Sequence, residues 1–155
     1  MSLLVMEHVE HPFGKGDLTS DGVQYSDLHT TTTDDYEAVE TVTIEPRPAV
    51  KFFELEVGLT CSIQSSSTTE SVLFKWQARN KGGTYQDLHT EVTRAANASA
   101  LAEYTYSGRI EAVAGLLDQL PIDVRLVIKS GGAGGETAKG KTKSSSYVKI
   151  VYPTT

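Results

Sequence analysis

The feature that most constrains the fold is a stretch of alternating apolar and polar residues that ends in a tight turn. From Val72 to Ala78 every second residue is apolar, a period of two that is typical of a β-strand with one buried face. Residues 80–83, Asn-Lys-Gly-Gly, suit a tight chain reversal, and residues 84–93 return with many β-branched and aromatic side chains. The stretch from Ser71 to Thr93 therefore predicts a β-hairpin, with Trp76, the single tryptophan, anchoring the core.

Further segments of the chain show the same period. Strands are predicted at residues 38–44, 51–63, 103–113, 122–129 and 147–152, with a bulge or bend at Gly58 and a bend at Gly108. Residues 130–146 are rich in Gly, Lys and Ser and are interpreted as a loop. About seven or eight short strands without a long helix predict an all-β fold, a jelly-roll-like β-sandwich, with a partly open barrel as the alternative.

Charge divides the chain at about residue 45. Residues 1–45 hold ten of the 20 acidic residues and one of the 14 basic ones, which gives −9, while the remainder carries +3. This first part is poor in apolar runs, and Pro46 and Pro48 follow it. We therefore expect an acidic, extended N-terminal arm at 1–45 and a β-sandwich domain at 46–155.

Such an arm lacks the apolar surface to order itself alone, so it needs a partner. Thirty extended residues reach about 100 Å, and the opposite charge of the domain favours contact with a neighbouring copy. We expect the arm to lie on a neighbouring subunit or on a shell beneath, and its loss through residue 36 to abolish assembly but not folding. The residues expected to make these contacts are Asp34, Asp35, Tyr36, Val39, Val42 and Ile44.

The single cysteine, Cys61, excludes an internal disulfide and a cysteine-based zinc site. It falls on the apolar side of the 51–63 strand, so a buried and unreactive thiol is expected. The apolar run near the N-terminus is too short for a signal peptide or a membrane span. We therefore expect a protein with no export signal and no membrane partner, cytoplasmic unless it belongs to a virus particle.

Two motifs suggest ligands. Residues 135–142 spell GxxxxGK[ST], but a phosphate-binding loop needs a following helix, whereas a strand follows here, so a hairpin loop is the preferred interpretation. Residues 25–30, YSDLHT, recur as YQDLHT at 85–90, and two Asp/His pairs could ligate a metal. A repeated local packing solution is the simpler interpretation, and no metal or cofactor is predicted.

No catalytic constellation occurs in the sequence, so no enzyme activity is predicted. Nucleic-acid binding is disfavoured by the net charge of −6 and by the lack of a basic stripe. Three strand tyrosines offer an alternative function, because aromatic rings on a sandwich face can stack on sugars. A carbohydrate-binding module with a platform of Tyr85, Tyr104 and Tyr106 is therefore the competing hypothesis.

A small β-sandwich behind a long acidic arm resembles, in its organisation, the accessory virion proteins of tailed phages. Capsid decoration proteins come first in this resemblance, and tail or head-fibre components come second. The resemblance implies a structural protein located in the virion. It also implies a homo-oligomer, often a trimer, seated on a shell of major capsid protein.

Overall fold

The structure is a computed structural model that describes residues 5–16, 19, 22–46, 50–66, 71–95, 100–131 and 138–153. These residues form eleven β-strands. No helix among them is long and apolar enough to cross a membrane. The strands are β1 (Val5–Glu10), β2 (His29–Thr31), β3 (Glu37–Ile44), β4 (Glu54–Ser65), β5 (Val72–Asn80), β6 (Gln86–Asp87), β7 (Val92–Arg94), β8 (Ala102–Glu111), β9 (Ile122–Ser130), β10 (Ala138–Thr142) and β11 (Tyr147–Pro153).

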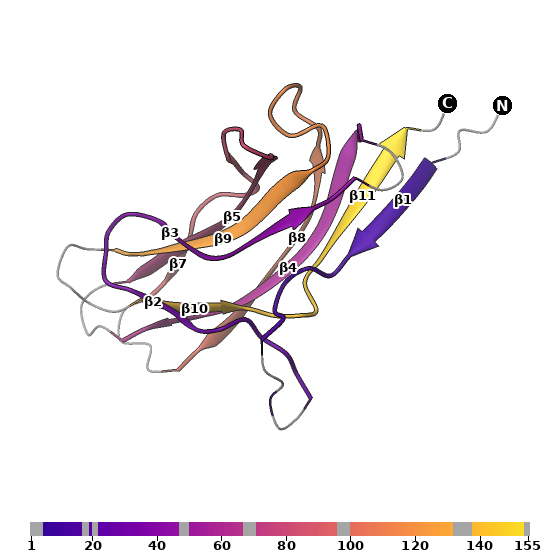
Figure 1. Ribbon diagram of the computed structural model, residues 1–155. Helices are drawn as coiled ribbons and strands as arrows, with labels where there is room; N and C mark the ends of the chain where they lie inside the picture. The colour runs from indigo at the N-terminus through magenta and orange to yellow at the C-terminus, as the bar shows by residue number, and fades with distance from the viewer. Residues whose placement is uncertain are drawn as a thin grey trace.

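The strands build two antiparallel sheets (Figure 1). The first sheet has the order β1-β11-β4-β10-β2, with β8 also paired to β4, and the second has the order β3-β9-β5-β6, with β7 also paired to β5. Strands distant in the chain pair with each other, as β3 does with β9 and β4 with β10. The predicted all-β, jelly-roll-like sandwich is confirmed, and the barrel alternative is not.

The core lies between the sheets and follows the predicted alternation. The inward side of β4 buries Leu55, Val57, Leu59, Cys61 and Ile63, each 0–1% exposed. Strand β9 contributes Ile122, Val124, Leu126 and Ile128, and β11 contributes Val148, Ile150 and Tyr152. Trp76 is 1% exposed on β5, which confirms it as a core anchor.

The central hairpin is confirmed, but its returning strand is interrupted. Gly82 takes a φ of 82° in the turn, a conformation that glycine adopts without steric cost. Strands β6 and β7 both pair with β5, and Leu88 lies buried between them, its N–H donating to the Trp76 carbonyl. The return breaks into two short strands because this segment turns Leu88 into the core.

Residues 1–45 do not behave as predicted. Strands β1, β2 and β3 pair with β11, β10 and β9 of the same chain. Phe13 is 0% exposed in the core, and one oxygen of Glu40 accepts from the Gly14 N–H and the Thr142 hydroxyl. The expected arm on a neighbouring subunit, and the division at residue 45, are therefore wrong for the described residues. Backbone pairing and a few well-placed apolar side chains hold a segment that is otherwise polar.

Two further expectations need correction. The predicted loop at 130–146 contains strand β10, whose small residues Ala138, Gly140 and Thr142 are buried while Lys139 and Lys141 alternate with them. Gly58 introduces no bulge, because β4 pairs regularly on both sides there. A side chain at position 58 would instead collide with the ring of Tyr147, which explains the glycine.

Candidate functional site

An aromatic slot opens between the edges of the two sheets. It has a volume of about 250 Å³ and is lined by Phe74, Trp76, His89, Val92, Tyr104, Thr105 and Tyr106. Phe74 and Trp76 come from the inward side of β5, and Tyr104 and Tyr106 from the inward side of β8. The period of two in both strands therefore places four aromatic rings around one opening.

Hydrogen bonds fix the polar groups of the aromatic slot. His89 Nε2 accepts from the Trp76 backbone N–H at 3.0 Å, so Nδ1 carries the proton and donates to the Thr90 carbonyl at 2.7 Å. The Tyr106 hydroxyl donates to the Leu88 carbonyl at 3.0 Å, and its ring lies 4.6 Å from that of His89. These hydrogen bonds fix the orientation of the His89 ring and hold the Tyr106 ring beside it at the slot.

The third predicted platform residue, Tyr85, lies elsewhere. Its ring faces the guanidinium carbons of Arg79 at 4.2 Å and Arg125 at 3.6 Å. These arginines belong to the outward side of β5 and β9, whose alternate residues fill the core. The structure therefore brings Tyr104 and Tyr106 together and separates Tyr85 from them, so a platform of all three tyrosines is wrong.

Tyr36 covers a neighbouring part of the same outward face. Its ring lies 4.7 Å from the ammonium nitrogen of Lys75 and 4.6 Å from that of Lys129, and its hydroxyl donates to Glu91. Between those lysines Val127 is 0% exposed although it lies outside the central core. Tyr36 is therefore engaged within its own chain.

The other residues expected in an assembly arm either pack against the core of this chain or are exposed in a turn. Ile44 is buried, Val39 and Val42 pack against the core, and Asp34 and Asp35 are exposed in a turn. A bulge between Ala38 and Glu40 turns Val39 to the inward side, where it packs against the core. These residues stabilise the sandwich, and only the two aspartates remain free to contact a partner through their side chains.

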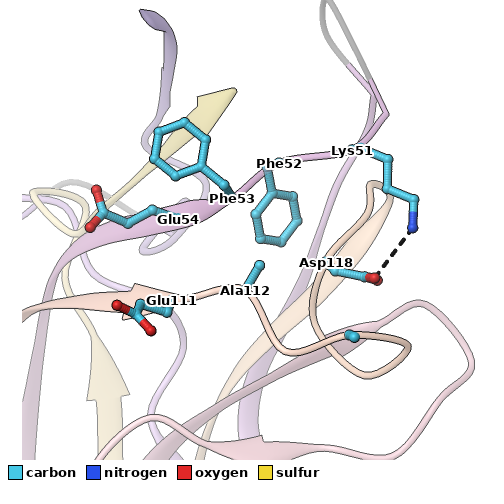
Figure 2. Close-up of a pocket in the computed structure, with 8 residues that line it drawn as sticks. Lys51, Phe52, Phe53, Glu54, Glu111, Ala112 and Asp118 are labelled. Carbon is cyan, nitrogen blue, oxygen red and sulfur yellow. Dashed lines mark hydrogen bonds and ion pairs between the residues drawn. The ribbon is translucent and has the colours of Figure 1, made fainter. Parts of the chain in front are cut away.

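A second hollow of about 540 Å³ lies at one end of the sandwich, with Phe52, Phe53 and Ala112 in its lining. Figure 2 shows the Lys51–Asp118 ion pair at one side and the carboxylates of Glu54 and Glu111 at the other. The Gly115 N–H and the Asn80 amide, followed by Lys51, hold the pKa of Asp118 below its usual range. This network ties the 115–119 turn to the end of β5, which is a structural role.

The motifs that suggested ligands do not converge. The first Asp/His pair leads into β2 of the first sheet and the second lies around β6 of the second sheet. His29 pairs with Glu37, and Asp87 with Lys75 and Gln77. No group of three metal-ligating side chains occurs within the described ranges, and the two copies of the motif do not form one site. Residues 139–142 lie in β10 rather than before a helix, and residues 135–137 fall outside the described residues.

The sequence matches no protein-family model and no curated protein. Solved structures of similar fold include the VP2 subviral particle of infectious bursal disease virus, with a TM-score of 0.56 and 8% identity over 96% of this chain. The Gt strain of that virus gives a TM-score of 0.54 and 9% identity over 96% of the chain. In both cases the chain spans about a third (33%) of the viral protein.

A xylan-binding module aligns over 99% of this chain and all of its own length, with 16% identity and a TM-score of 0.41. That score is too low to bear on the fold. At identities of 8–9% the viral likeness establishes the fold alone: a jelly roll shared with viral capsid proteins. It does not single out the accessory proteins of tailed phages.

Proposed function

We propose that this protein is a non-enzymatic structural component of a virus particle that associates with itself. The observation that carries the proposal is the jelly-roll likeness to a viral particle protein over 96% of the chain, at TM-scores of 0.54 and 0.56. Within this class the protein acts as a capsid decoration or stabilising protein, seated on a shell of major capsid protein. The support for self-association no longer includes an N-terminal arm, because β1 to β3 are part of the sandwich.

The experiment is light scattering and negative-stain imaging of the purified protein over a range of concentrations. The proposal predicts particles of defined copy number, larger than the 16.8 kDa chain. A monomer at every concentration contradicts it. A trimer would agree with the copy number that decoration proteins often have. A different closed oligomer would change the expected copy number but would still support self-association.

One observation favours a second candidate, a carbohydrate-binding module. Tyr104 and Tyr106 meet beside Trp76 in the aromatic slot, and aromatic rings are the surfaces on which sugar rings stack. A glycan array tests this candidate. Binding that is lost in Tyr104→Ala and kept in Tyr85→Ala would support it, because Tyr85 lies outside the slot. An array without bound glycan contradicts it.

A further inference from the structure

Strand β8 forms an open edge of the first sheet. Its ten residues, Ala102–Glu111, pair with β4 in one uninterrupted register, and no other described strand pairs with it. Its outward-facing side chains Glu103, Thr105, Ser107, Arg109 and Glu111 are all exposed. A long, regular edge of this kind is a template for another strand.

The hydrogen bonds of Thr60 show which backbone groups of β8 are free. The Thr60 N–H donates to Ser146 Oγ at 2.8 Å, and its carbonyl accepts from the same hydroxyl at 3.1 Å, both on the side away from β8. In an antiparallel sheet the backbone groups of successive residues alternate in direction. The odd-numbered residues of β4 therefore bond to β8, and the odd-numbered residues of β8 direct N–H and C=O to the open edge.

The other described edges suit a partner less well. Strand β3 is interrupted by a bulge, and β2, β6 and β7 have three residues or fewer. Strand β1 has six residues and carries Glu7 and Glu10 without lysine or arginine, so it offers these carboxylates no basic partner on a second copy. Strand β8 combines length and regularity with charges of both signs.

The charges of β8 are self-complementary. A two-fold axis through Tyr106 sets Glu103 opposite Arg109 of the second copy, and the same pair recurs on the other side of the axis. Thr105 then faces Ser107 of the second copy, again twice. All four of these residues belong to the odd-numbered set, so the pairs are hydrogen-bonded and would exchange about eight backbone bonds. A two-fold axis through Ser107 would instead oppose Glu103 with Glu111.

The side chains at these positions are available for such pairing. The Arg109 side chain is 71% exposed and lies 3.9 Å from Glu56, a loose ion pair. The Glu103 side chain is 45% exposed and pairs with Lys143 at 3.0 Å on the outer face of the sheet. Both can accept a second partner of opposite charge without leaving the first.

We propose that two copies of this chain join through antiparallel pairing of β8 with β8, around a two-fold axis at Tyr106. The two first sheets then form one continuous sheet, with Glu103 and Arg109 specifying the register. This inference deepens the proposed function and rests on it, because it names the surface through which the structural subunits associate.

Charge reversal tests the register. Sedimentation equilibrium should show that Glu103→Arg and Arg109→Glu each weaken self-association by about tenfold or more, since each places like charges opposite each other twice. The double variant exchanges the two charges and should restore association to within about threefold. Glu111→Arg is the matched control, because residue 111 faces no charge in this register. Strengthening by Glu111→Arg would overturn the axis at Tyr106 in favour of one at Ser107.

Ser107→Pro tests the pairing itself, because its N–H points to the open edge and bonds to no other described strand. The variant should be dissociated while its circular dichroism stays that of the parent, which shows that the fold is kept. Suppose that the parent associates and that neither the charge reversals nor Ser107→Pro change the association constant. Pairing through β8 is then wrong, while the proposed function stands. If the parent is monomeric throughout, the proposed function fails as well.

Discussion

The ring of Phe13 packs edge to face against the indole of Trp76, with centroids 5.1 Å apart and planes at 81°. Phe13 follows β1 and Trp76 is the centre of β5, so this contact joins the acidic N-terminal part of the chain to the central hairpin. It shows directly that residues before 45 contribute to the core.

Phe13→Ala and Trp76→Ala should each lower the free energy of unfolding by about 3–5 kcal/mol, because each empties a filled core position. Denaturant unfolding of both single variants and the double variant should give a coupling of about 0.5–1.5 kcal/mol for the ring pair. Phe53→Ala is the control: Phe53 is 42% exposed, so a loss below about 1 kcal/mol is expected. A loss that small for Trp76→Ala would place the indole at the surface.

Deletion of residues 1–36 should unfold the sandwich, not merely prevent assembly. The deletion removes Phe13 from the core, together with the partners of β11 and β10. Near-ultraviolet circular dichroism of the truncated protein should lose the signal of packed aromatic rings. A truncated protein that keeps this signal and unfolds cooperatively would show that the first strands are dispensable.

The network around Asp118 should make stability depend on pH. Asp118→Ala should cost about 1–3 kcal/mol at neutral pH, because the Gly115 N–H and the Asn80 amide lose their charged acceptor. The folded-state pKa of Asp118 is lowered, so this contribution is complete above the unfolded-state pKa of about 3.9 and is lost as pH falls through the folded one. Asp35→Ala, in an exposed turn, is the control. If the difference in the free energy of unfolding between the parent and Asp118→Ala does not change with pH, the stabilising role of the ionised Asp118 carboxylate is wrong.

Cys61 should resist thiol reagents in native buffer. It is 0% exposed, and burial raises the pKa of its thiol, which leaves little reactive thiolate. Labelling should therefore follow unfolding and become fast in denaturant. Ser107→Cys, on the exposed side of β8, should label quickly in the same buffer. Fast labelling of Cys61 in the native protein would mean that its side chain does not lie on the inward side of β4.

The fold class could be predicted because the segments 51–63, 72–78, 122–129 and 147–152 alternate without a break, and Trp76 and Cys61 fall on their apolar sides. The placement of residues 1–45 could not be predicted. These residues pair with distant strands through backbone hydrogen bonds, which leave no local pattern in the sequence. Strand β10 was missed for a related reason. Its buried residues Ala138, Gly140 and Thr142 are small, and their alternation with Lys139 and Lys141 is the signal that could have revealed it.

The candidate site could be predicted only in part. Tyr104 and Tyr106 are two residues apart on one strand, which places them on one face. Tyr85 belongs to a segment that leaves β5 for the outward face, where Arg79 and Arg125 hold it. His89 and Trp76 complete the aromatic slot, joined by the hydrogen bond from the Trp76 backbone N–H to the His89 ring. The spacing of these residues in the sequence does not predict this contact.

The proposed role as a structural component of a virus particle can be tested by immunogold labelling. Antibody raised against the purified chain would be applied to virus particles isolated from the source culture and imaged by electron microscopy. Gold should appear at regular positions on the particle surface, and pre-incubation of the antibody with the purified protein should remove the label. Particles that stay unlabelled, while the same antibody detects the protein only in the particle-free fraction, would contradict it.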